Sequence, residues 1–290
     1  MKQKITLFFL LATTFLSAQI TYTGFIDKYP IEFATDIYSD GVGTGIYAYS
    51  NFDTPISLKA KLTGKTLIFT EKDKNGKESA QLIFQNYNSK SAQLNGIWKD
   101  LNSGKELQIN LSKMFEINSG NKIEWGEREI LQSVSFKDKY FKLILSKRKG
   151  DYEAKVIGVK IIEKRTDKVL QKIDLECQLL GLNNISIDDY NFDGIEDFSV
   201  YEAGTAGPDS SSLYFLYNPK TGKYFESGFS GSSLEFDSKT KRIHEHNQCC
   251  AGTSVMEAEY KVVNNKMVLI KKTCFKYDEK INDLKKVKCD

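Results

Sequence analysis

The chain is poor in histidine, has no cysteine before Cys177, and its charges nearly cancel. Two histidines occur in 290 residues, and 41 basic residues face 38 acidic ones, a formal net charge of +3. Setting aside Lys2 and Lys4 leaves 39 against 38, or +1. A nucleic-acid partner normally requires a strongly basic patch or stripe, so this balance argues against one.

Long hydrophobic runs are also lacking, apart from one at the start of the chain. A basic n-region, Met1 to Lys4, precedes an apolar run from Ile5 to Leu16, and Ser17-Ala18 offers a small-residue cleavage site. The run is too short to span a membrane. We therefore expect a signal peptide over 1–18. No cysteine stands at the cleavage point, so we expect no lipid anchor and a periplasmic or secreted protein without a membrane span.

No segment shows a convincing helical period, and the chain is predicted to be all-β. Strands with turn signals such as Asn75-Gly76 between them follow one another from Ile20 to about Lys113. Their number, eight, predicts that residues 19–115 form an antiparallel meander or small barrel, closed so that no edge is left open. Residues 116–126 are polar, contain Gly120, and are predicted to be a linker. Residues 127–290 are predicted to form a second antiparallel β domain, propeller-like or a sandwich.

A calcium loop is predicted inside this second domain. Carboxylates and an amide at every second position, a glycine and a further aspartate follow the order in which a tight loop supplies hard oxygens to Ca²⁺. The predicted ligands are Asp189, Asn191, Asp193, the carbonyl of Ile195, and Asp197, with Gly194 at the sharp turn. The twelfth position is Val200 instead of a glutamate, and the flanks alternate as strands do. The alternative is an Asx-rich turn without an ion.

A resemblance extends this prediction over residues 130–290. The motif Asp189-x-Asn191-Phe192-Asp193-Gly194-x-x-Asp197-Phe198 is followed by Leu213-Tyr-Phe-Leu-Tyr-Asn218-Pro219-Lys-Thr-Gly222. This order resembles the exported calcium-binding inhibitors of lysozyme-like peptidoglycan hydrolases, including immunity proteins of antibacterial effectors. The loop alone is similar to the FG-GAP calcium loops of integrin α propellers.

The resemblance implies that the calcium is structural and supports neighbouring loops that contact a hydrolase. We call the segments 203–212 and 228–233 the contact loops. Their candidate protein-binding residues are Gly204, Pro208, Asp209, Ser210, Phe229 and Ser230. The alternative is that both are only solvated connections. The implied function is an exported, non-catalytic binding protein whose partner is a cell-wall hydrolase. A different hypothesis is a lipocalin-like carrier that holds a small ligand inside the N-terminal barrel.

The five cysteines all lie in the second half of the chain, which in an exported protein favours disulfides. The preferred pairing joins Cys249 or Cys250 to Cys274, and an odd count leaves one cysteine over. His244 and His246 lie close to the vicinal pair, so a zinc or copper site is an alternative.

Enzymatic activity is not expected. Gly228-Phe-Ser230-Gly-Ser232 is one glycine short of a nucleophile elbow and lacks a strand–turn–helix setting. No phosphate-binding glycine loop is present, and with 38 acidic residues a catalytic carboxylate pair cannot be singled out.

Overall fold

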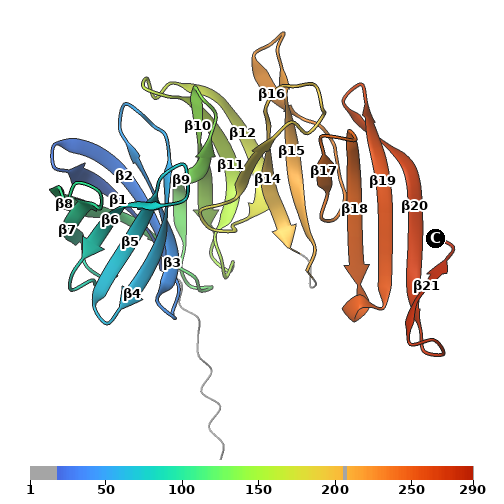
Figure 1. Cartoon of the computed structure of the whole chain (residues 1–290), viewed down its shortest axis with the longest axis horizontal. Helices are drawn as coiled ribbons and strands as arrows, with labels where there is room; N and C mark the ends of the chain where they lie inside the picture. Colours follow the sequence, from blue (N-terminus) through green and yellow to red (C-terminus); the bar gives the residue numbers. More distant parts are fainter. Residues whose placement is uncertain (1–17, 205–207, 290) are drawn as a thin grey trace, which may run out of the picture.

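The structure, a computed structural model, describes residues 18–204 and 208–289. Its regular elements there are β-strands and one short 3₁₀ turn, η1 (Cys250–Gly252), which confirms the predicted all-β class. The predicted signal peptide lies outside the described residues except for Ala18, which begins β1. None of the described helical segments has the length and apolar character needed to cross a bilayer. Figure 1 shows four β units in a row along the longest axis.

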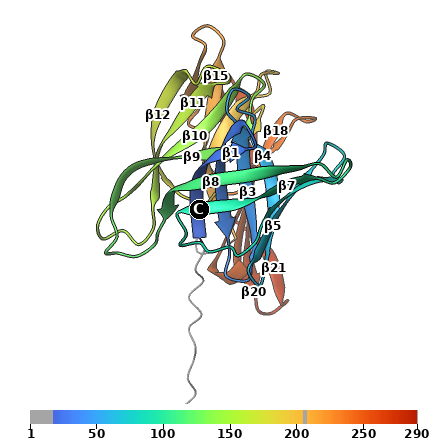
Figure 2. The same ribbon diagram turned by 90° about the vertical axis from the view of Figure 1, so that its left-hand side faces the viewer.

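The first unit is the predicted barrel. Its eight antiparallel strands close because β1 pairs with both β2 and β8. The strands are β1 (Ala18–Ile26), β2 (Tyr29–Ile37), β3 (Val42–Tyr49), β4 (Ile56–Thr63), β5 (Thr66–Lys72), β6 (Glu78–Phe84), β7 (Gln93–Asp100) and β8 (Glu106–Ile117). Seen from the barrel end in Figure 2, the other three units lie behind it.

The interior of the barrel is filled with side chains. Alternate residues of its strands point inward, and among them Phe33, Phe69 and Phe84 are fully buried. The Phe33 and Phe69 ring centroids are 5.0 Å apart, and those of Phe69 and Phe84 are 6.0 Å apart. Glycine is needed beside these rings, because a Cβ at Gly45 would lie 2.7 Å from the Phe69 ring. A barrel packed in this way gives no support to the hypothesis of a carried ligand.

Three antiparallel sheets follow the barrel. The first sheet has strands β9 (Trp125–Ser135), β10 (Lys139–Lys147), β11 (Lys155–Glu163) and β12 (Val169–Gln178). The second has β13 (Ile185–Asp188), β14 (Asp197–Gly204), β15 (Ser210–Asn218) and β16 (Lys223–Glu226). The third has β17 (Glu235–Asp237), β18 (Arg242–Cys249), β19 (Ser254–Val263), β20 (Lys266–Asp278) and β21 (Asp283–Val287). Each is an up-and-down meander, and successive sheets stand face to face in a propeller-like row (Figure 1).

Shared hydrophobic cores join the units. Phe141 of the first sheet and Phe198 of the second are both fully buried in one core, with ring centroids 5.1 Å apart. Ala34, Ile46 and Ala48, from the outer surface of the barrel, belong to that same core. The chain passes from the barrel to the sheets between β8 and β9, within the segment predicted as a linker. The barrel and the sheets are therefore held together by packing as well as by this connection.

The predicted disulfide was wrong. Cys274 pairs with Cys289, and Cys177, Cys249 and Cys250 are free. The register explains the difference, because β19 places Met256 and not Cys249 opposite Cys274. On the other side of β20, β21 places Val287 opposite Cys274, which brings Cys289 within reach. Sequence spacing alone could not distinguish these two registers.

Candidate functional site

The predicted calcium loop, residues 189–197, connects β13 and β14. Its residues alternate between a buried and a polar side. Tyr190 is buried, and its ring contacts Tyr214 and Phe236 with centroids 4.9 Å and 4.7 Å away. Phe192 packs against the same hydrophobic core, which lies between the second and third sheets and which we call the third core. The aromatic residues thus anchor the loop on its inner side, and this leaves Asp189 and Asp193 for the polar side.

The polar side chains fold the front of the loop into a compact turn. The two carboxylate oxygens of Asp189 accept the N–H groups of Asp193 and Gly194, at 3.0 Å and 2.8 Å. Asp193 Oδ1 accepts the N–H of Ile195 at 2.9 Å, and Asn191 Oδ1 accepts the Asp193 N–H at 3.1 Å. Gly194 has a φ of 90°, which glycine adopts without strain. The structure therefore brings Asp189, Asn191 and Asp193 together.

Asp197 lies deeper than the other predicted ligands. Its side chain is 1% exposed, with Oδ1 accepting the Tyr217 N–H at 2.8 Å and Oδ2 the Tyr190 N–H at 3.1 Å. Burial is the main cause that raises the pKa of Asp197 to about 7, and the nearby charges of Asp193 and Asp189 raise it further. The Asp197 carboxylate is thus a buried group that a bound cation would stabilise.

The donors of this loop fit calcium in type. Three carboxylates, the Asn191 amide oxygen and the Ile195 carbonyl are the hard oxygen ligands that Ca²⁺ takes. A carboxylate oxygen that accepts one N–H keeps further lone-pair capacity for a metal. In the described parts of the chain, no three His, Cys, Asp or Glu side chains by themselves come together as a metal-binding group. A cation here would therefore depend on the amide and the main-chain carbonyl as well as on the aspartates.

Contacts with the third sheet hold the loop from its other side. Asn191 Nδ2 donates to Asn265 Oδ1 at 3.0 Å, in the turn between β19 and β20. Lys241 Nζ donates to the Phe192 carbonyl at 3.1 Å, from the turn between β17 and β18. Nothing local in the sequence shows that the distant turn at Asn265 meets this loop. The loop is thus the point where the second and third sheets are tied together at one end.

The first contact loop lies at the opposite end of β14 from the 189–197 loop, whereas Phe229 of the second contact loop shares a hydrophobic core with Tyr190 and Phe192. β14 runs from Asp197, at the calcium loop, to Gly204, where the first contact loop begins. An eight-residue strand spans roughly 23 Å between these ends. Residues 205–207 of this loop lie outside the described residues.

Two of the predicted contact residues are buried. Phe229 packs in the third core, with its ring 6.3 Å from that of Tyr214, and Asp209 is 5% exposed. Gly204, Pro208 and Ser230 are exposed, and Ser210 is half-buried. The structure therefore gives Phe229 and Asp209 packing and anchoring roles, and leaves the others at the surface.

Buried carboxylates fix both contact loops to the third sheet. Asp209 Oδ2 accepts the Gln248 N–H at 2.7 Å, and its Oδ1 accepts the Ser233 hydroxyl at 3.3 Å. Glu245 Oε1 accepts the Ser232 N–H at 3.0 Å, and its Oε2 accepts the Tyr260 hydroxyl at 2.6 Å. Charge-assisted bonds of this kind are stronger than neutral ones. These bonds consequently hold the described parts of both loops against the third sheet.

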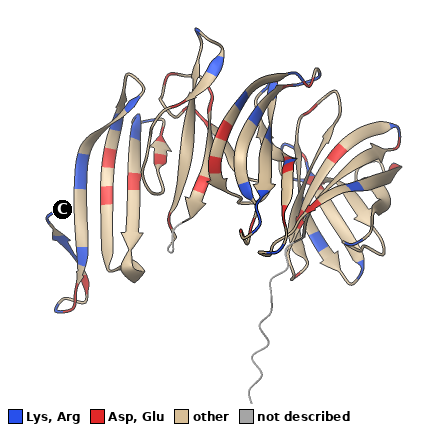
Figure 3. Ribbon diagram, turned by 180° about the vertical axis from the view of Figure 1, so that it is seen from behind, with Lys and Arg blue, Asp and Glu red and all other residues tan. Residues whose placement is uncertain are grey.

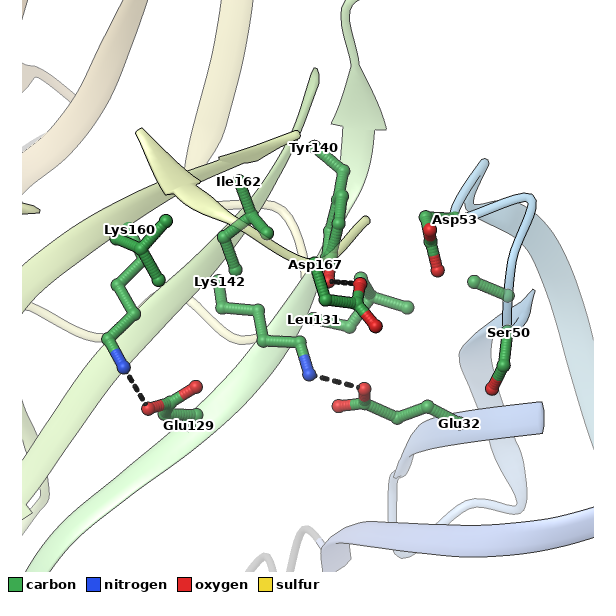
Figure 4. Close-up of a pocket in the computed structure, with 12 residues that line it drawn as sticks. Glu32, Ser50, Asp53, Glu129, Leu131, Tyr140, Lys142, Lys160, Ile162 and Asp167 are labelled. Carbon is green, nitrogen blue, oxygen red and sulfur yellow. Dashed lines mark hydrogen bonds and ion pairs between the residues drawn. The ribbon is translucent and has the colours of Figure 1, made fainter. Parts of the chain in front are cut away.

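A polar cleft lies between the barrel and the first sheet (Figure 4). Its volume is about 320 Å³. Glu32 of β2 accepts Lys142 Nζ of β10 at 2.6 Å, so this ion pair joins the two units. Lys160 Nζ lies 2.5 Å from Glu129 Oε1, within the first sheet. Each of these lysines in the cleft thus has a carboxylate partner.

Two more acids line the same cleft. The Tyr140 hydroxyl donates to Asp167 Oδ1 at 2.7 Å. Asp53, in the turn after β3, accepts the Arg165 N–H at 2.7 Å, and burial raises the pKa of its carboxyl. The sequence did not indicate this cleft, because its charged residues are scattered over separate strands and turns. They come together only where the barrel contacts the first sheet. We interpret the hydrogen bonds and ion pairs of the cleft as the polar part of the contact between the barrel and the first sheet.

The two histidines line a depression to which neither Cys249 nor Cys250 contributes. His244 and His246 stand on the outer face of β18, where they line a shallow depression with Glu235 and Glu257. Cys249 and Cys250 come at the end of that strand, with their sulfurs 2.7 Å apart. Among the described residues, these side chains form no metal-binding group of three or more. The structure therefore adds no support to the zinc or copper alternative.

Comparison with known proteins yields distant matches among solved structures. No family model and no curated protein matches the chain. A Xanthomonas type IV secretion system related protein is 10% identical, with 93% of this chain and 99% of that chain covered and a TM-score of 0.28. A putative 6-phosphogluconolactonase from Bacteroides fragilis is 8% identical, with coverages of 93% and 94% and a TM-score of 0.26. The β-propeller domain of the trilobed protease from Pyrococcus furiosus is 11% identical, with coverages of 95% and 72% and a TM-score of 0.20. At such TM-scores these similarities carry no argument about this chain.

Proposed function

We propose that this chain is an exported, non-catalytic binding protein whose C-terminal sheets hold a structural Ca²⁺ and bind another protein. The observation that carries the proposal is the 189–197 loop. It gathers Asp189, Asn191 and Asp193 around a tight turn. Asp197, at its end, is buried without a cationic side chain bonded to it. A buried carboxylate is costly unless it is compensated, and Ca²⁺ would compensate this one.

The role of the ion would be mechanical. Asn191 and Phe192 already connect the loop to turns of the third sheet. A cation bound by Asp189, Asn191, Asp193, the Ile195 carbonyl and Asp197 would stiffen the same junction between the second and third sheets. The chemistry supplied by the metal is charge compensation.

The second part of the proposal, a protein partner, is supported by the contact loops. Asp209 and Glu245 join their described parts to the third sheet, and Gly204, Pro208 and Ser230 remain exposed. Exposed loops on a rigid β scaffold are a usual place for recognition. The resemblance of residues 130–290 to hydrolase inhibitors indicates a lysozyme-like cell-wall hydrolase as the partner.

An inhibition assay tests this partner. The mature chain is expected to slow peptidoglycan cleavage by muramidases of the lysozyme type. Replacing Pro208 and Ser230 with glutamate should weaken the inhibition, while Ser103→Glu, at an exposed turn of the barrel, should leave it unchanged. If neither muramidases nor chitinase-like hydrolases are slowed or captured, the hydrolase assignment is wrong.

A further inference from the structure

The last sheet ends in a strand whose outer edge is only partly covered. β20 is 13 residues long and pairs with β19 along nearly its whole length. On its other side, β21 pairs with β20 only from Cys274 to Asp278. The segment Lys266–Thr273, which we call the open edge, therefore has no strand on the side away from β19 in the described chain. Every second residue of an antiparallel strand directs its N–H and C=O toward such a free side.

The middle of the open edge carries apolar side chains that are exposed. Val268, Leu269 and Ile270 are 39%, 51% and 45% exposed, and Val263 on the adjoining strand is 42% exposed. Natural proteins usually protect a free edge, because it is a template for pairing with another chain. The register shift at Ile270 and the flanking lysines are protections of that kind. The three consecutive exposed apolar residues at this edge have the opposite effect, because they favour pairing with another chain.

The charge along the open edge and the strand after it is mostly basic. Between residues 261 and 288 the chain has nine lysines and three acidic residues. Figure 3 shows the basic positions along β20 and β21 near the C-terminus. Lys266, Lys271 and Lys272 are exposed, and within the described chain they form no ion pair, since the neighbouring Glu259 pairs with Arg242 at 3.2 Å.

From the free backbone, the exposed apolar residues and the unpaired lysines together, we propose that the open edge binds an extended acidic segment of a partner protein as an added strand. Main-chain hydrogen bonds supply the affinity in strand addition, and side chains at alternate positions supply the specificity. Because Ile270 is in the bulge, Val268 shares one face of the strand with Lys271, and Leu269 shares the other with Lys272. Valine or threonine in the segment would meet Val268 or Leu269, and glutamate or aspartate would meet the lysines. This inference rests on the proposed function only in treating the chain as a binding protein, because the surface is a different one.

A peptide experiment tests the proposal. The probe is a labelled peptide that alternates valine with glutamate. One control peptide carries lysine instead of glutamate, and another has the same side chains but N-methylated amides along one edge. The acidic peptide should bind the mature chain, more weakly at high salt, and should slow amide exchange at residues 266–273. Both controls should fail to bind.

Matched variants separate the edge from the rest of the molecule. Changing Lys266, Lys271 and Lys272 to glutamate should reverse the preference toward the lysine peptide. The same charge change at the exposed barrel residues Lys59, Lys61 and Lys72 should not. The proposal is overturned if N-methylation leaves binding intact, if exchange slows elsewhere, if no peptide binds, or if the edge is protected only in a dimer of this chain. Because the calcium response and hydrolase inhibition are measured on the same variants, their survival would show that the edge proposal alone has failed.

Discussion

Replacing Asp197 with alanine should destabilise the second sheet more than any other single change in the calcium loop. The side chain is buried, and its two oxygens accept the N–H groups of Tyr190 and Tyr217. Each buried donor left without a partner costs about 1–3 kcal/mol. Removing the buried charge recovers part of this cost, so the expected loss is about 2–4 kcal/mol of unfolding free energy.

Two further variants should lose less unfolding free energy than Asp197→Ala. Asp197→Asn keeps one acceptor oxygen, so about half of the loss is expected. Asp189→Ala removes acceptors for Asp193 and Gly194 at the surface of the loop, where water can replace them, and about 1 kcal/mol is expected.

Urea unfolding followed by circular dichroism in the presence of a chelator measures these differences without a contribution from metal. An Asp197→Ala protein within about 0.5 kcal/mol of the parent would refute the argument, because ordinary surface substitutions lie in that range. So would an Asp189→Ala protein that loses more stability than Asp197→Ala.

Three further outcomes are expected elsewhere in the chain. Gly96→Ala should lower the melting temperature, because its Cβ would lie 2.4 Å from a main-chain oxygen of β6; an unchanged melting curve would mean that the barrel is looser than described. Lys142→Met breaks the ion pair that joins the first sheet to the barrel, and it should cost about 1 kcal/mol in urea unfolding at low salt and less at high salt. In alkylation followed by mass spectrometry, Cys249 and Cys250 should react in the folded protein. Cys177 should stay unmodified at pH 8, because burial raises the pKa of its thiol to about 11 and the reactive thiolate is scarce; modification of Cys177 first would contradict its placement.

The strands and the barrel could be predicted from the sequence because their signals are local. Alternation and turn pairs such as Asn75-Gly76 appear within a few residues, and the predicted eight strands do close into a barrel. The 189–197 loop could be singled out for the same reason, since its polar residues recur at fixed short spacing, and its calcium stays a prediction. These are features that a short window of sequence contains.

What could not be predicted depends on contacts between distant segments. The partner of Cys274 follows from the register of β20 against β19 and β21, which spacing does not determine. The burial of Phe229 follows from the packing of the third sheet on the second. The contact of Asn191 with Asn265 spans 74 residues, and no local pattern indicates it. Each of these required knowledge of which faces and turns meet.

Calcium titration of the chelator-treated chain, prepared without residues 1–18, is the most direct test of the proposed calcium site. One Ca²⁺ is expected to bind per chain and to raise the melting temperature. At a calcium concentration about 100 times the Kd, the gain in unfolding free energy should be about 2.7 kcal/mol. Asp193→Ala should abolish this gain, while Asp237→Ala, which removes a similar aspartate from an exposed turn, should retain it. Titration without heat of binding and without a change in melting temperature would contradict the account.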